Sequence, residues 1–328
     1  MNRNFVDFME QYRGQKLAVA VSGGVDSIAL LHWLAELKMD IVCLHVNHCL
    51  RAAADTEAEY VQKTCEKLGV PCHVFRWCDD KPLAGIEDAA RMARYKFMTD
   101  FCHENKIGFI ITAHQADDQI ETFWMNLGRG SGVYGLAAMR GRAGMNGIRI
   151  LRPLLNVFRR ELRDYCDTNG IKYFSDEMND DPHYTRVKIR QNRHLVQDNL
   201  GIPDERVLLA IQNLGRVRET LEADVRSLVA RVIQGNYALF NETFLFDLSP
   251  DVRLKFLGTV IRKIGGDRYQ ARLDSLMRAL DNLRSDCKFT IGHCTVRRLK
   301  GEILVVPEGQ KTSFRKRHGK KYFKQKQK

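Results

Sequence analysis

Hydrophobic residues in the first 200 positions alternate between short apolar runs and longer stretches with helical spacing. The apolar runs predict strands at residues 17–21, 41–46, 72–77 and 108–112. Helical spacing predicts helices at residues 25–38, 55–68, 87–105, 116–128, 158–169 and 185–199. Strands that alternate with helices in this way are typical of a parallel sheet covered by helices on both faces. We therefore expect an α/β fold with a doubly wound parallel sheet.

The pattern changes after residue 200, where Gly201, Ile202 and Pro203 favour a break in the chain. A long helical segment is expected at residues 204–234, followed by a short stretch at 244–248 and helices at 250–264 and 271–283. Three further runs, at 287–292, 295–299 and 302–306, predict a small antiparallel meander. The expected organisation is an α/β domain, a helix-rich α+β domain and a basic tail, over residues 1–200, 201–310 and 311–328.

The positive charge of the chain is concentrated near its end. The formal net charge is +12, and residues 311–328 hold nine Lys or Arg and no Asp or Glu. Without them 12 − 9 = +3 remains, so the rest of the 328-residue chain is only mildly cationic. Such a charge favours a large polyanionic partner, with RNA as the leading candidate. Phe314, Tyr322 and Phe323 in the tail suit stacking on bases, although a disordered, solubilising end fits the same composition.

Cysteine usage and hydropathy indicate a soluble, cytoplasmic protein. The chain has nine cysteines but no C-x-x-C pair, which favours reduced thiols packed as small hydrophobes over metal ligands. The first residues lack the apolar segment of a secretion signal, and no apolar run approaches the length needed to span a membrane. We therefore expect no membrane partner. The sequence does not determine the oligomeric state, and a homodimer is one of the states it allows.

A glycine-rich loop joins the first predicted strand to the first predicted helix. Its residues, which we expect to bind ATP, are Ser22, Gly23, Gly24, Val25, Asp26 and Ser27. The glycines let the backbone approach an anion closely, and the helix N-terminus behind them favours phosphate. A carboxylate repels phosphate unless a cation lies between them, so we expect Asp26 to bind Mg²⁺. The alternative is an ordinary strand-to-helix turn in which Ser and Asp cap the helix.

Polar clusters follow three of the predicted strands, and the carboxyl ends of parallel strands meet at one crevice. After the glycine-rich loop come residues 45–51, which read HVNHCLR, and residues 112–122, which read TAHQADDQIET. In the last cluster His114, Asp118 and Glu121 lie on one face near the start of a helix. This face suits completing a Mg²⁺ shell, orienting a substrate or accepting a proton. Carboxylates in a first helical turn also suit the helix dipole without any further role.

Several arginines are further candidates. Arg91 and Arg94 share a helical face with Glu87, although a Glu87–Arg91 pair would also stabilise a solvated helix with no further purpose. Residues 130–135 match G-x-G-x-x-G, but they follow a predicted helix rather than a strand, which argues against a dinucleotide site. We interpret them as a permissive loop in which Arg129 either faces a phosphate or lies on a plain surface.

Six motifs appear in order between Ser22 and Leu155, namely SGGVDS, HVNHCLR, GIEDAARMARY, TAHQADDQIET, LGRGSGVYGL and RPLL. The first resembles the loop of PP-loop ATP pyrophosphatases, and the series resembles the tRNA(Ile)-lysidine synthetase family. This resemblance extends to about Arg190, beyond which only the layout is similar. It implies an ATP-dependent C–N ligase whose substrates are ATP, free L-lysine and the wobble cytidine of an isoleucine tRNA with a CAU anticodon. The products would be lysidine, AMP and pyrophosphate.

The resemblance also gives the ATP and lysine sites a chemical meaning. The glycine-rich loop would donate hydrogen bonds to pyrophosphate, and Asp26 would hold Mg²⁺ as the β-phosphate departs. Asp118 and Glu121 would recognise the lysine ammonium or Mg²⁺, and one of them would accept the ammonium proton.

Histidine and arginine residues complete the expected catalytic set. His114 would position the cytidine or a phosphate, and either Arg91 or Arg94 would stabilise the adenylate. The residues expected to bind tRNA are Arg129, Arg186 and Arg190. Met178 and Val187 stand where the family often has Ser and Asn, so no hydrogen bonds from those two side chains are expected.

Two alternative functions follow from the same residues. One is another PP-loop pyrophosphatase that modifies RNA or a nucleotide. The other is a non-catalytic RNA-binding protein that holds ATP as a ligand. Release of AMP and pyrophosphate separates the enzymes from the binding protein.

Overall fold

The computed structural model describes residues 2–49, 53–78, 85–174, 185–267, 270–285, 288–309, 312–317 and 320–325. The chain divides into two compact units, Met1–Arg216 and Val217–Lys328. The division lies within one continuous helix, α9 (Asp204–Val232), whereas the sequence placed it after residue 200. Gly201, Ile202 and Pro203 do interrupt the helical structure there, but they only separate α9 from the helix before it.

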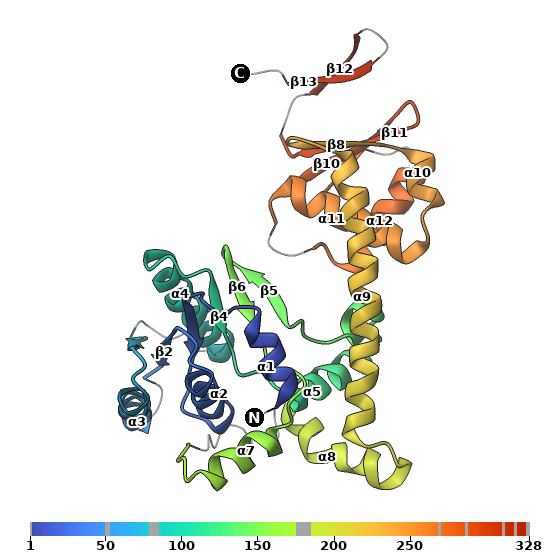
Figure 1. Ribbon diagram of the computed structural model, residues 1–328. Helices are drawn as coiled ribbons and strands as arrows, with labels where there is room; N and C mark the ends of the chain where they lie inside the picture. The colour runs from blue at the N-terminus through green and yellow to red at the C-terminus, as the bar shows by residue number, and fades with distance from the viewer. Residues whose placement is uncertain are drawn as a thin grey trace. The chain divides into compact units, whose positions relative to one another are not determined.

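The first unit is built on a six-stranded sheet with the strand order β3-β2-β1-β4-β6-β5 (Figure 1). The four predicted strands are confirmed as β1 (Leu17–Ala20), β2 (Ile41–Asn47), β3 (Cys72–Arg76) and β4 (Phe109–Ile111). They run parallel, as does β6 (Ile148–Leu151) beside β4. The edge strand β5 (Arg142–Met145) runs antiparallel to β6.

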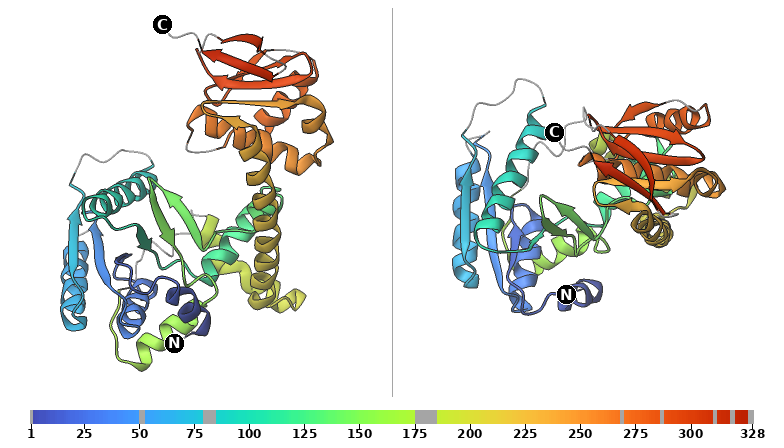
Figure 2. Two further views of the ribbon diagram at one scale, coloured as in Figure 1. Left: turned by 45° about the horizontal axis from the view of Figure 1, so that its top comes forward. Right: turned by 90° about the horizontal axis from the view of Figure 1, so that it is seen from above.

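Helices cover both faces of this sheet, which confirms the doubly wound α/β fold (Figure 2). Alternate residues of β1 enter different cores, because successive strand side chains point to opposite faces. Leu17 and Val19 pack against α1 (Arg3–Glu10), α2 (Val25–Glu36), α3 (Ala53–Leu68) and α7 (Arg159–Thr168). Ala18 packs on the other face with residues of α4 (Ile86–Glu104).

The first unit has three more helices. They are α5 (Ala116–Leu127), α6 (Val133–Leu136) and α8 (Thr185–Leu200). Of these, α5 and α6 follow β4 in the chain and α8 precedes α9. Ile120 of α5 packs against Val207 and Ile211 of α9, so the N-terminal half of α9 belongs to this unit. Among the described residues, no helix is long and apolar enough to cross a membrane.

The second unit combines the later part of α9 with a five-stranded sheet of order β7-β8-β11-β10-β9. The predicted meander is confirmed as β9 (Phe289–Ile291), β10 (Cys294–Leu299) and β11 (Glu302–Pro307). The sheet continues through β8 (Tyr237–Asn241) and β7 (Ile233–Gln234).

Its helices are α10 (Glu242–Asp247), α11 (Pro250–Gly265) and α12 (Leu273–Arg284). Phe256 and Leu257 of α11 and Leu276 of α12 form the core with Val296 of β10. The basic tail contributes a separate antiparallel hairpin, β12 (Thr312–Arg317) and β13 (Lys320–Gln325).

Candidate active site

The glycine-rich loop follows the carboxyl end of β1, and hydrogen bonds between the Ser27 side chain and the loop backbone stabilise its conformation. The Ser27 hydroxyl accepts hydrogen bonds from the backbone N–H groups of Ser22 at 3.1 Å and Gly23 at 3.2 Å, and it donates to the Gly24 carbonyl at 2.9 Å. Gly23 has a φ of +97°, which side-chain-bearing residues rarely adopt. Ser27 therefore has a structural role in the loop, and its contact with pyrophosphate stays a prediction.

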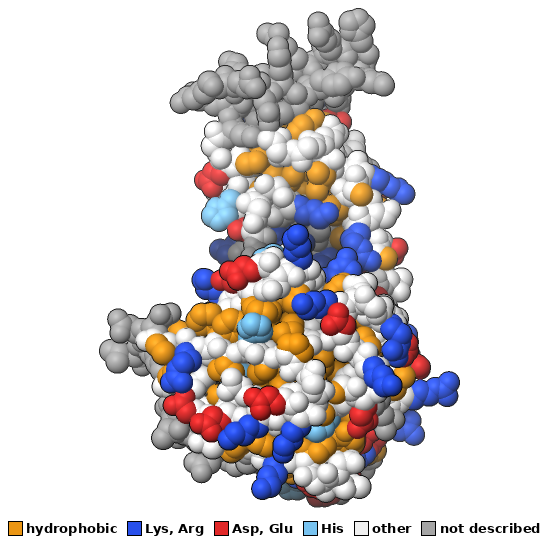
Figure 3. Space-filling view, turned by 60° about the vertical axis from the view of Figure 1, so that its left-hand side comes forward, with side chains coloured by type: hydrophobic (Ala, Val, Ile, Leu, Met, Phe, Trp, Pro, Cys, Tyr) orange, Lys and Arg blue, Asp and Glu red, His pale blue; other side chains and the backbone are white. Residues whose placement is uncertain are grey.

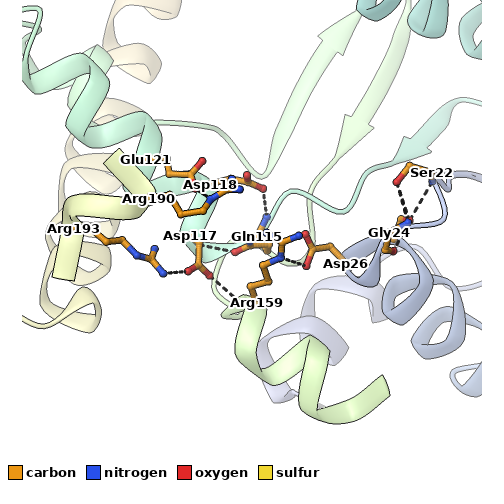
Figure 4. A network of polar contacts seen from close by, with 11 residues as sticks. Ser22, Gly24, Asp26, Gln115, Asp117, Asp118, Glu121, Arg159, Arg190 and Arg193 are labelled. Carbon is orange, nitrogen blue, oxygen red and sulfur yellow. Dashed lines mark hydrogen bonds and ion pairs between the residues drawn. The ribbon is translucent and has the colours of Figure 1, made fainter. Parts of the chain in front are cut away.

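Asp26 lies in the first turn of α2 and faces Arg159 at the start of α7 (Figure 4). Its Oδ1 atom is 3.6 Å from Arg159 Nε, and it accepts no hydrogen bond from any described residue although it is buried. Burial raises the pKa of Asp26 to about 6, against the lowering effect of Arg159, and the charges of Asp118 and Asp117 raise it further. A buried carboxylate oxygen without a hydrogen bond, close to further carboxylates, fits the oxygen ligands that Mg²⁺ prefers.

The N-terminus of α5 is closed by a reciprocal capping arrangement. The Gln115 side chain accepts from the Asp117 N–H at 2.5 Å, and Asp118 Oδ2 accepts from the Gln115 N–H at 3.0 Å. Burial raises the pKa of Asp118 to about 6; the Gln115 hydrogen bond lowers it and the Glu121 charge raises it. One oxygen of Asp118 thus serves the helix, so the capping role and the expected chemical role fall on the same side chain.

Glu121 lies one turn further along α5 and is only 1 % exposed. Its Oε1 atom accepts a hydrogen bond from Arg190 Nε of α8 at 2.8 Å. Its Oε2 atom is buried and accepts no hydrogen bond from the described residues. Arg190 was expected to bind tRNA phosphate; in this structure it pairs with a carboxylate of the site, and its tRNA contact stays a prediction.

Asp117 is a residue of this site that the sequence analysis did not single out. It is buried, and its Oδ2 atom accepts from the backbone N–H of Arg159 at 2.9 Å. Its Oδ1 atom accepts from the guanidinium of Arg193, whose Nε lies 3.5 Å from Asp204 Oδ2. Asp117 therefore joins the start of α5 to α7 and α8, and Arg193 extends the connection to α9 (Figure 4).

His114 precedes α5 and lies in a cationic environment. Its Nδ1 atom is hydrogen-bonded to Thr112 Oγ1 at 2.9 Å. Burial lowers the pKa of His114 to about 3, so the ring is neutral near pH 7. Arginine charges lower it further, and they belong to Arg152, Arg91, Arg186 and Arg94.

Two of these arginines have a buried donor nitrogen without an acceptor among the described residues. The two nitrogens are the Nε atoms of Arg94 and Arg152. Burial lowers the pKa of both guanidinium groups, and the positive charge of Arg91 lowers them further. A group of buried cations with unused donors is suited to binding an anion. Arg152 belongs to the RPLL motif but was not expected to be part of the site.

The remaining sequence candidates make no hydrogen bond or ion pair that the structure describes with these arginines. Arg129 is exposed, directly after α5, beside the loop that leads to α6. His45 Nδ1 donates a hydrogen bond to the Val21 carbonyl at 2.8 Å, and Asn47 donates to Asp55 at 2.7 Å, so the second motif ties β2 to neighbouring segments. Met178 and residues 50–51 lie outside the described residues, and Val187 of α8 is buried, as an apolar residue there should be.

Comparison with known proteins shows the same relationship over most of the chain. Residues 1–196 match the PP-loop domain family. The chain is 34 % identical over 316 residues to the tRNA(Ile)-lysidine synthase of Ruegeria pomeroyi, covering 90 % of this chain and 74 % of that one. It is 33 % identical over 321 residues to that of Wolbachia pipientis, covering 94 % and 74 %. It is 31 % identical over 302 residues to that of Rickettsia bellii, covering 89 % and 70 %.

The fold also occurs among solved structures. One of them is the U34-tRNA thiolase NcsA from Methanococcus maripaludis with its [4Fe-4S] cluster, at 16 % identity and a TM-score of 0.53. The match covers 65 % of this chain and 78 % of the thiolase, so it supports the arrangement of the elements alone. The family match and the three long alignments go further, and they show that this chain belongs to the tRNA(Ile)-lysidine synthase family of PP-loop enzymes.

Proposed function

We propose that this protein joins free L-lysine to C2 of the wobble cytidine in an isoleucine tRNA with a CAU anticodon, and that ATP is converted to AMP and pyrophosphate. Relatives named tRNA(Ile)-lysidine synthase support the choice of substrate. The observation that carries the proposal is the meeting of a PP-loop with carboxylates at the start of α5. One buried oxygen of Asp26 and one of Glu121 accept no hydrogen bond from the described residues, as groups awaiting cationic ligands would.

In the first step, the O2 atom of cytosine attacks the α-phosphorus of ATP. The new O–P bond forms as the bond from the α-phosphorus to the bridging oxygen breaks, and pyrophosphate leaves. The N-terminus of α2, which begins directly after Gly24, suits the departing anion. Arg94 and Arg152, with unused buried donors, suit the charge on the transferred phosphoryl group.

In the second step, the ε-amine of lysine attacks C2 of the adenylated cytidine. The bond from C2 to O2 breaks, AMP leaves with that oxygen, and the amine gives up a proton. Asp118 is suited to accept it, because a pKa near 6 lets a carboxylate exchange protons close to neutral pH. Neutral His114 is too weak a base for this step and is suited to holding the base or the phosphate by hydrogen bonds.

Asp26 is the residue best placed to hold Mg²⁺, because its buried Oδ1 atom accepts no hydrogen bond within the part of the chain that the structure describes. When bound, the ion would neutralise charge on the phosphates of ATP and on the leaving pyrophosphate. Arg159, 3.6 Å from the same oxygen, orients the carboxylate. Asp117 in turn holds the backbone of Arg159 in place.

The test combines purified protein, Mg-ATP, lysine and an isoleucine tRNA transcript with a CAU anticodon. AMP release is followed, and mass spectrometry detects a cytidine heavier by lysine less water. The proposal predicts a lysine-dependent adduct that Asp26→Ala abolishes and that Asp7→Ala, a change at an exposed aspartate of α1, leaves intact. AMP release without the adduct would contradict the choice of nucleophile or acceptor. Binding of the tRNA without AMP release would favour a non-catalytic protein.

A further inference from the structure

Three cysteines from three elements of the first unit meet on one face of the sheet. Cys43 of β2 and Cys72 of β3 are paired residues of neighbouring parallel strands, and Cys65 lies on α3, which covers that face. Their three sulfur atoms all lie within 4.8 Å of one another. Cys43 and Cys65 are fully buried, whereas Cys72 is partly exposed. The sequence spacing gave no sign of this, because the three residues approach only through the fold.

This cluster is separate from the candidate active site. Cys43 is paired with Val19 in the middle of β1, whereas the glycine-rich loop starts after the end of that strand. None of the hydrogen bonds or ion pairs described for the site involves these thiols. A buried cysteine usually packs as a small hydrophobe against aliphatic groups, but here three sulfur atoms lie within 4.8 Å of one another.

The cluster has one side open to solvent, because Cys72 is partly exposed whereas Cys43 and Cys65 are buried.

We propose that Cys43, Cys65 and Cys72 bind a single thiophilic metal ion of the d¹⁰ class, such as Cu⁺ or Zn²⁺, through three sulfur ligands. Soft thiolate ligands select such ions over Mg²⁺. Sulfur atoms bound to one ion at about 2.3 Å lie about 4 Å apart, so small side-chain rotations bring the cluster into ligating geometry. Cysteines of an iron–sulfur cluster bind different iron atoms and lie further apart, so the spacing favours a single ion. The ion would fasten the edge strand β3 and α3 to β2.

The test uses the full-length chain, reduced and handled without oxygen, with Cd²⁺ as the probe. Cys49 and Cys78 lie 3.8 Å apart at their sulfur atoms and form a second thiol pair, so both are first changed to Ser to give the reference protein. Titration is followed by the ultraviolet charge-transfer absorption of thiolate-bound cadmium. We expect one Cd²⁺ per chain in the reference protein, and a loss of affinity of about tenfold or more on Cys72→Ala.

The matched control is Cys102→Ala, a buried cysteine of α4 on the opposite face of the sheet, which should leave Cd²⁺ binding unchanged. Thermal unfolding followed by circular dichroism shows whether each variant folds. Zn²⁺ should raise the unfolding temperature of the reference protein and of Cys102→Ala but not of Cys72→Ala. Equal Cd²⁺ binding by the reference protein and Cys72→Ala would overturn the proposal, as would an absence of thiolate absorption in a folded reference protein.

Discussion

Burial raises the pKa of two carboxyl groups in the site, those of Asp26 and Asp118. Each has a pKa raised to about 6, chiefly because the fold removes water from the carboxyl group. A bound cation would stabilise the carboxylate charge as water does at the surface. A buried, ionised carboxylate therefore favours a cationic ligand. The charged form therefore destabilises the empty protein and stabilises the complex.

Replacing Asp26 by Asn should abolish AMP formation and yet stabilise the empty protein near pH 7. The folded state keeps its proton up to about pH 6, whereas the unfolded carboxyl loses it near its ordinary value of 3.8. Ionisation of Asp26 thus reduces stability as pH rises through this range, by about 3 kcal/mol at most. The measurement is the free energy of unfolding of both proteins in urea at pH 7 and at pH 4. The stabilisation should disappear at pH 4, and an Asp26→Asn protein less stable than its parent at pH 7 would contradict this account.

Asp118→Asn separates the charge of this residue from its capping role. The Asn oxygen can still accept from the Gln115 N–H, so α5 should keep its start while the lysine ammonium loses a carboxylate. We expect the KM for lysine to rise about tenfold or more and turnover to fall. The unfolding temperature near pH 7 should rise, because the raised pKa means that the buried charge destabilises the empty protein. Steady-state kinetics with varied lysine provides the measurement, and Asp118→Ala, which removes cap and charge together, is the comparison. Unchanged lysine KM and turnover in Asp118→Asn would remove Asp118 from the lysine site.

At the scale of elements, the N-terminus of α5 is connected by hydrogen bonds and ion pairs to three other helices of the first unit. Asp117 binds the start of α7 through the Arg159 N–H and binds α8 through Arg193, which also approaches Asp204 at the start of α9. These contacts fix the helix that carries Asp118 and Glu121. Precise placement of those carboxylates depends on pairs that join segments far apart in the sequence.

Arg193→Ala should therefore reduce both stability and lysine use. It leaves the buried Asp117 carboxylate without its guanidinium, which costs about 3 kcal/mol when a buried pair is broken. The matched control is Arg160→Ala, because Arg160 pairs with Glu205 between exposed side chains of α7 and α9 and should contribute less than about 1 kcal/mol. Urea unfolding gives the stabilities, and the KM for lysine shows whether α5 has shifted. Equal effects of the two substitutions would exclude a positioning role for Arg193.

The sequence predicted those elements whose own residues show a clear pattern of apolar runs, helical spacing or turn residues. The strands β1 to β4 were predicted because each is a short apolar run that ends at turn residues. The site motifs were predicted because they directly follow three of those strands. β5 was missed because it is only half-buried and has no apolar run, and β6 because Arg149 interrupts its apolar residues. The turn between them, Asn146 and Gly147, has positive φ at both residues and was an unused hairpin signal.

Other parts of the site carry no local signal. Arg159 and Arg193 look like any surface arginine in the sequence, and only tertiary contacts bring them to Asp26 and Asp117. Asp117 adjoins Asp118, so spacing alone does not distinguish the carboxylate that holds the helices together from the one that we propose to act on lysine. The cysteine cluster is a further case, because β2, α3 and β3 bring its members together only after folding.

At the scale of the whole molecule, most of the excess positive charge belongs to the last 18 residues of the chain. On the face shown in Figure 3, basic and acidic side chains are interspersed over the described surface. Residues 311–328 account for nine of the twelve net positive charges, and their described parts form a hairpin that is not part of the five-stranded sheet. Charge of this kind contributes to RNA affinity without reading sequence.

Ending the chain at residue 310 should accordingly weaken tRNA binding and leave the chemistry of bound substrate intact. Each phosphate contact that is lost reduces the slope of log affinity against log salt by about 0.9 for a duplex and about 0.7 for a single strand. Binding of the tRNA transcript is measured at several salt concentrations for the full and shortened chains, and single-turnover AMP release at saturating tRNA reports the chemistry. Because β12 and β13 pair only with each other among the described strands, the shortened chain should fold. A salt slope equal to that of the full chain would show that the tail does not contact phosphate and would leave it the role of a solubilising end.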